Sequence, residues 1–274
     1  MNQHSDPKAI AQRRFATPDH CVGLVELAER YSSEVPEAVR TLLDAVKPRG
    51  AKADRICELG FGSGWLLEEM ARGFPESRLY GLDMSIGMAA RAQGLWGDRV
   101  AVLVADMERL PFCQASLDVV VTCWTLHFMR DIDGALEEIK RCLRPRGRLV
   151  AAASAPDHMV EYDQLATAAI RSALGRLPEP DLSARFNPDN GQSYMRRHYR
   201  DVELHRWHGW MTLPDVASLL RLWDAWRPDS LAGPDGDLVR AEFKRLAQEW
   251  LQRDGQIRIS KHAGLLIGAK AATA

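Results

Sequence analysis

The sequence is short of several features, and each shortage excludes a class of protein. Its 36 lysines and arginines almost balance 37 aspartates and glutamates, giving a net charge of -1, so it lacks the basic footprint of most nucleic-acid-binding proteins. No apolar run reaches the roughly 18–20 residues of a membrane helix. The first residues, MNQHSDPKAIAQRR, lack the apolar core of a secretory signal. We therefore expect a cytoplasmic protein with no membrane partner and no nucleic-acid partner.

Cysteine is scarce as well. The five cysteines, at positions 21, 57, 113, 123 and 142, are odd in number and form no C-x-x-C pair. A disulfide framework or a structural zinc site is therefore not expected. Spacings such as H-x-x-x-H are also missing, and we expect no metal.

What the chain does contain is an alternation of short apolar runs and helical runs. Strands are predicted at 55–59, 78–83, 100–106, 117–123 and 147–154, and helices between them at 64–74, 85–95 and 132–143. This alternation predicts an α/β fold, a doubly wound Rossmann-like sheet that is mostly parallel.

Other parts of the chain surround this core. Residues 1–50 are predicted to form a helical N-terminal cap, and 51–155 the cofactor-binding core. Residues 156–255 form a helical region for the acceptor, a lid or insertion with one strand near 201–211, and contain a Pro/Asn/Gly-rich stretch at 178–191. Residues 256–274 supply a final strand that completes the sheet.

The glycines after the first strand follow the pattern E-x-G-x-G-x-G, at Glu58, Gly60, Gly62 and Gly64. A dinucleotide fingerprint, G-x-G-x-x-G, would need glycine where Trp65 or Leu67 stands, so both registers fail. The phosphate P-loop fails too, because no Gly-Lys-Ser/Thr follows. A strand, a glycine turn and a helix still place a ligand site at this point.

ICELGFGSG resembles the first motif of class I S-adenosylmethionine-dependent methyltransferases, with Glu58 in place of the commoner Asp. RLYGLDMS, VLVADMERLPF and the segment 117–150 extend the resemblance over residues 54–153, and RISKHAGLLIGAK extends it more weakly. The chain looks most like the small-molecule branch that includes quinone-biosynthesis enzymes. The resemblance implies S-adenosyl-L-methionine as the cofactor and an antiparallel C-terminal strand.

The resemblance also implies roles for individual residues. The loop passes under the methionine and ribose parts of the cofactor, Asp83 accepts both ribose hydroxyls, and Asp106 accepts from the adenine amino group. Met84 packs on adenine, Cys123 makes a backbone contact, and Tyr31 covers the cofactor. The predicted cofactor site consists of Tyr31, Glu58, Gly60, Phe61, Gly62, Gly64, Asp83, Met84, Asp106, Met107 and Cys123.

The methyl acceptor is less determined. His127 stands four residues beyond Cys123 and is a candidate general base, with His205 and His208 as alternatives. Enzymes that methylate the amines of nucleic-acid bases commonly carry Asn/Asp-Pro-Pro-Tyr/Phe after the fourth strand. This chain reads TCWTLHF there, which argues against such an acceptor. Five tryptophans between 207 and 250 suit a flat apolar acceptor.

We therefore predict methyl transfer to oxygen or nitrogen of a small molecule. The alternatives are an RNA or protein methyltransferase of the same fold, and a non-catalytic protein that binds S-adenosylmethionine.

Overall fold

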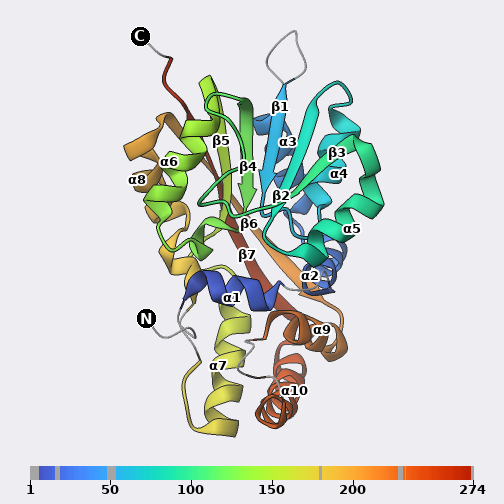
Figure 1. Ribbon diagram of the computed structural model, residues 1–274. Helices are drawn as coiled ribbons and strands as arrows, with labels where there is room; N and C mark the ends of the chain where they lie inside the picture. The colour runs from blue at the N-terminus through green and yellow to red at the C-terminus, as the bar shows by residue number, and fades with distance from the viewer. Residues whose placement is uncertain are drawn as a thin grey trace.

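The computed structural model describes residues 6–15, 19–47, 54–178, 181–227, 231 and 233–272. Its centre is a seven-stranded sheet in the order β3-β2-β1-β4-β5-β7-β6 (Figure 1). The strands are β1 (Arg55–Leu59), β2 (Arg78–Asp83), β3 (Val100–Val104), β4 (Leu117–Cys123), β5 (Leu143–Ser154), β6 (Arg200–Leu213) and β7 (Ile257–Ala269). The first five strands are parallel, and β7 is antiparallel to both β5 and β6. The predicted sheet is confirmed.

The chain reverses its direction across the sheet between β1 and β4. It runs outward from β1 to β2 and β3, and then returns to place β4 on the other side of β1. Their carboxyl ends therefore border a crevice, which is where ligands bind in sheets of this kind. Val119, Val120 and Val121 of β4 are fully buried, as expected for a central strand covered on both faces.

Two layers of helices cover the sheet, and each layer contributes to its own apolar cluster. One layer holds α3 (Val35–Val46), α4 (Trp65–Gly73) and α5 (Ile86–Trp96), and the other α6 (Ile132–Cys142) and α8 (Pro188–His198). The connecting turns are η1 (Gly97–Arg99), η2 (Leu126–Phe128) and η3 (Leu182–Arg185).

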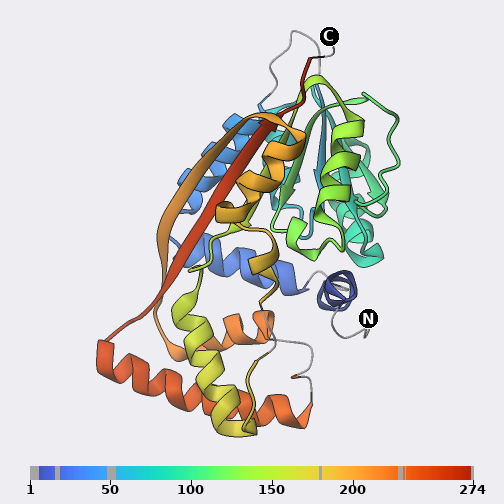
Figure 2. The same ribbon diagram turned by 90° about the vertical axis from the view of Figure 1, so that its left-hand side faces the viewer.

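A third group of helices lies beyond the carboxyl ends of the parallel strands (Figures 1 and 2). It comprises α1 (Pro7–Arg14), α2 (Asp19–Tyr31), α7 (Val160–Leu174), α9 (Val216–Trp226) and α10 (Pro234–Asp254). The last four of these helices share an apolar cluster that contains Tyr162, Trp223 and Phe243 and also Met211 of β6. None of the helices in the described ranges has both the length and the apolar character needed to cross a bilayer.

Strand β7 begins at Ile257, close to the start of the predicted final segment 256–274, and pairs along its length with β6. Helix α8 begins inside the Pro/Asn/Gly-rich stretch. It can do so because the Asn187 side chain accepts from the backbone N–H of Asn190 at 3.1 Å, while the Asn190 side chain accepts from the Asn187 N–H at 2.9 Å. These two bonds form a capping box.

Candidate functional site

A cavity of about 890 Å³ lies at the carboxyl ends of β1, β2 and β4. Its walls come from the glycine loop, from the ends of these strands, and from α1, α2, α7 and α9. Small-molecule sites occupy roughly 300–1,000 Å³. The cavity is therefore large enough for a cofactor with a small acceptor beside it.

The glycine loop adopts backbone conformations that other residues rarely reach. Gly60, Gly62 and Gly64 have φ angles of +69°, +53° and +81°. The Gly62 N–H donates to Asp83 Oδ2 at 3.0 Å, and a Cβ added to Gly62 would lie 3.3 Å from the Cys21 sulfur of α2. Gly60 and Gly62 line the cavity, whereas Gly64 is the N-cap of α4 and faces the Trp96 ring.

Asp83 ends β2 with its carboxylate at the cavity wall and is only 7% exposed. Oδ2 accepts from Gly62 N–H, and Oδ1 accepts from Ser85 N–H at 2.9 Å. Burial raises the pKa of Asp83, and these backbone donors oppose that rise. A carboxylate has about four acceptor positions, so this one retains capacity for two ligand hydroxyls.

Glu58 lies deeper in the same wall, on β1, and is 1% exposed. Among the described residues, its Oε2 has no hydrogen-bond partner. Burial, and secondarily the charge of Asp83, raise the pKa of Glu58 well above its usual range. A buried polar atom without a partner is costly, and a cationic or hydroxyl-bearing ligand would satisfy it.

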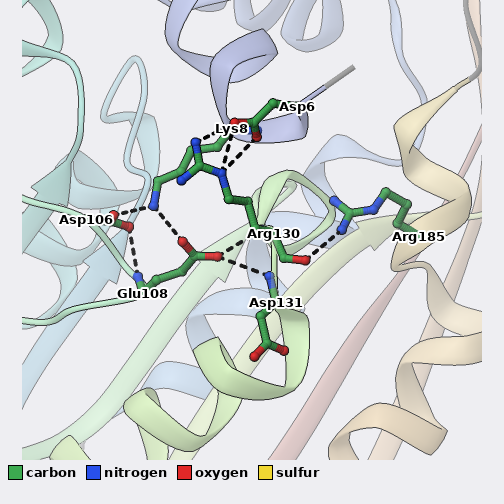
Figure 3. A network of polar contacts seen from close by, with 7 residues as sticks. All are labelled: Asp6, Lys8, Asp106, Glu108, Arg130, Asp131 and Arg185. Carbon is green, nitrogen blue, oxygen red and sulfur yellow. Dashed lines mark hydrogen bonds and ion pairs between the residues drawn. The ribbon is translucent and has the colours of Figure 1, made fainter. Parts of the chain in front are cut away.

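Asp106 follows β3 and is engaged by a residue of helix α1. Its carboxylate pairs with the Lys8 ammonium of α1, and it is not among the residues that line the cavity (Figure 3). Burial is the largest single effect and would raise the pKa of Asp106, but the hydrogen bonds from Lys8 and the Glu108 N–H, with the charges of Lys8 and Arg130, together outweigh it, so the pKa lies below its usual range. The adenine role of Asp106 stays a prediction, and its carboxylate is also paired with Lys8, while the neighbouring Met107 lines the cavity.

Hydrogen bonds and ion pairs hold helix α1 against the loops beside the cavity (Figure 3). Lys8 also donates to Glu108 Oε2 at 2.6 Å, and the Arg130 Nε donates to Asp6 Oδ2 at 2.9 Å. Arg185 supports the strand-end side of the network by donating to the Arg130 carbonyl at 3.2 Å. Both acidic partners of Lys8 follow β3, so α1 is tied to the loop beside the cofactor end of the cavity.

His127 lies on η2 and lines the cavity, as expected. Burial lowers its pKa to about 4, so the imidazole is neutral near pH 7 and only a weak base. Burial raises the pKa of the Cys123 thiol well above its usual range. Cys123 is therefore a protonated group of the wall and not a nucleophile.

The structure brings most of the predicted residues together and separates the rest. The cavity is lined by Glu58, Gly60, Phe61, Gly62, Asp83, Met84, Met107, Cys123 and His127. It is not lined by Tyr31, Gly64, Asp106, His205 and His208. His205 and His208 belong to β6, where His205 pairs weakly with Glu203 at 3.6 Å and the His208 ring faces His262.

Beyond His127 the cavity continues between the helices of the third group. Three of the five tryptophans, Trp207, Trp223 and Trp226, line it, and Trp210 and Trp250 do not. Among the polar residues that line the cavity but were not predicted from the sequence are Glu34, His158 and Lys261. They come from distant segments, and no local motif marks them.

Comparison with known proteins agrees with this geometry. Residues 57–151 match the family model described as Methyltransferase domain. A malonyl-[acyl-carrier protein] O-methyltransferase of Methylovorus sp. is 33% identical over 162 residues, which are 56% of this chain and 53% of that protein. The match thus spans about half the length of that relative.

Solved structures share the fold at low sequence identity. The YcgJ protein of Bacillus subtilis is 16% identical with a TM-score of 0.56, covering 86% of this chain and 99% of that one. A Haemonchus contortus phosphoethanolamine N-methyltransferase, solved with phosphomonomethylethanolamine and S-adenosylhomocysteine, is 16% identical with a TM-score of 0.51, covering 86% and 53%. Residues 57–151 are therefore similar to the methyltransferase domain family, and the chain has a Rossmann-like fold that it shares with these solved structures.

Proposed function

We propose that the protein binds S-adenosylmethionine in the cavity and transfers its methyl group to oxygen or nitrogen of a small molecule. One observation carries the proposal: two buried carboxyl groups, Glu58 and Asp83, flank a glycine loop with positive φ angles at the cavity wall. The cofactor has an ammonium, two ribose hydroxyls and no phosphate. The unpartnered Glu58 Oε2 would accept from the ammonium, and Asp83 would accept from the hydroxyls.

When bound, the cofactor supplies a methyl group attached to a sulfonium. The sulfur leaves as a neutral thioether, so its departure needs no acid. The chain's own contribution is to orient the acceptor and to exclude water. Helix α1 and the aromatic wall of α9 enclose the cavity for this purpose. Because His127 is a weak base, the proposal favours an acceptor atom that is already nucleophilic, such as an ionised oxygen or an unprotonated amine.

The relatives support oxygen as the accepting atom, because the Methylovorus protein and a Hahella chejuensis protein, 37% identical over 111 residues, are O-methyltransferases. We propose that residues 156–255 supply most of the acceptor pocket, with α1 and α2 closing it. An acyl group carried by a carrier protein, as in the names of those relatives, is one acceptor of the proposed kind.

Methyl-labelled S-adenosylmethionine incubated with the protein and a cell extract tests the proposal. We expect the label in the small-molecule fraction. If the acceptor is an acyl group on a carrier protein, we expect the label on protein, and hydroxylamine should release it by cleaving the thioester. Label in RNA, or on protein resistant to hydroxylamine, would contradict a small-molecule acceptor. Tight cofactor binding without transfer to any fraction would favour a non-catalytic binding protein.

A further inference from the structure

Three polar residues of the cavity wall, Lys261, His158 and Glu34, lie together on the β7 side of the sheet. Lys261 lies on β7, which is separated from β1 by β4 and β5. Three strand spacings of about 4.8 Å place it roughly 14 Å from β1, on the side away from β2. Lys261 therefore belongs to the acceptor part of the cavity and not to the part beside Glu58 and Asp83.

His158 fixes the position of the Lys261 ammonium. The His158 Nδ1 lies 2.7 Å from the His262 carbonyl oxygen, which can only accept, so Nδ1 carries the hydrogen. In the neutral ring Nε2 is then an acceptor, and it lies 3.4 Å from Lys261 Nζ. Burial lowers the pKa of His158 well below its usual range, which keeps the ring in this neutral state.

Glu34 completes the group from the start of α3. Gly209 stands opposite Lys261 in the β6–β7 ladder, and a Cβ added to Gly209 would overlap the Glu34 carboxyl group. The missing side chain thus leaves room for Glu34 beside Lys261. Burial raises the pKa of Glu34, and its Oε2 has no hydrogen-bond partner in the described ranges.

The Lys261 ammonium lacks a close counter-charge in the described part of the chain. None of the ion pairs found there, within 4.0 Å, involves Lys261; the nearby Asp157 pairs with His262 at 2.8 Å. Burial lowers the pKa of Lys261, and the charge of Glu34 only partly opposes that. An ammonium has three donors. His158 Nε2 accepts from one, and the Met159 sulfur accepts weakly from a second at 4.0 Å, so at least one donor remains for a ligand.

Taking the methyltransferase assignment as given, we propose that Lys261, positioned by His158 and flanked by Glu34, binds a carboxylate of the acceptor. A single ammonium matches a monoanion, and a protonated Glu34 would add a second donor. The rest of the acceptor would be apolar, because the cavity continues past Met211, Leu222 and Trp223. The substrate class is therefore an amphipathic carboxylic acid.

Calorimetric titration with decanoate and with decan-1-ol, each with and without S-adenosylhomocysteine, tests this site. We expect decanoate to bind the parent about tenfold or more tightly than the alcohol, since hydrogen bonds to charged groups carry that much discrimination. Lys261→Met should abolish the preference, and Lys261→Arg should retain most of it. Lys244→Met, at an exposed lysine of α10, is the matched control and should bind like the parent.

The outcomes separate the two claims. Equal binding of acid and alcohol, or an unchanged preference in Lys261→Met, would overturn the carboxylate site. A loss of S-adenosylhomocysteine affinity in Lys261→Met would also overturn it, by assigning Lys261 to the cofactor. A parent protein that fails to bind S-adenosylhomocysteine would contradict the proposed function, while the titrations without it still decide the role of Lys261.

Discussion

Asp83 is the residue at which loop geometry and proposed cofactor binding coincide, because its carboxylate accepts from the loop and faces the cavity. We expect Asp83→Ala to weaken S-adenosylhomocysteine binding by about 1–3 kcal/mol, since the ribose hydroxyls would lose charged acceptors. Calorimetry on the folded variant measures this. Asp98→Ala, at an exposed position of η1, is the control. Parent-like affinity in Asp83→Ala would place the ribose elsewhere.

His127 gives a pH-dependent prediction. Its pKa in the folded protein is about 4, because of burial, whereas an unfolded histidine titrates near 6.5. Between these values the unfolded state binds more protons, so this residue lowers stability as the pH falls through that window. We therefore expect the melting temperature of His127→Asn, measured relative to that of the parent, to be higher at about pH 5 than at about pH 7. An unchanged difference between the two pH values would refute the burial argument.

The same residue has a kinetic prediction once an acceptor is in hand. A general base contributes roughly a hundredfold or more to turnover, and a buried imidazole with so low a pKa is poorly matched to that task. We therefore expect His127→Asn to lose much less than that, with no recovery at high pH. A hundredfold loss that shrinks at high pH would restore His127 as the base.

At the scale of elements, α1 is the part whose position depends most on side-chain charge. Lys8→Met should loosen α1 and speed both amide exchange over Pro7–Arg14 and cofactor release, because Asp106 and Glu108 lose their shared cation. Hydrogen–deuterium exchange measures the first effect. Arg130→Met should act less, because its pair with Asp6 is more exposed. Parent-like exchange in Lys8→Met would show that apolar contacts hold α1.

The elements that the sequence predicted best are those whose pattern is local. The bounds of β1, β2 and β4 agree with the predicted ones, because each strand carries a run of buried apolar residues that the helical segments around it lack, and β4, which is covered on both faces, has the longest run. Helix α1 has almost no apolar face and is held by ion pairs with residues about a hundred positions away. Helix α8 depends on an asparagine capping box within a stretch rich in helix breakers. Neither feature has a periodic signal.

For the whole molecule, the same contrast separates the two ends of the cavity. The cofactor end was predictable because its residues follow consecutive strands, and parallel strands bring their carboxyl ends to one edge. At the acceptor end, Glu34 precedes α3, His158 lies in the loop before α7 and Lys261 lies on the antiparallel strand β7. Their proximity is therefore apparent only from the structure. The environment of Asp106 was not predictable from its motif either, because Lys8, which lies outside the motif, pairs with its carboxylate.

The central claim is that the cavity at the strand ends is a site for S-adenosylmethionine. Calorimetric titration of the purified protein with S-adenosylhomocysteine, and separately with NAD, tests it most directly. The account predicts one-site binding of S-adenosylhomocysteine that Asp83→Ala weakens, and no binding of NAD, because the glycine spacing departs from the dinucleotide fingerprint. Tight binding of NAD with no binding of S-adenosylhomocysteine would contradict it.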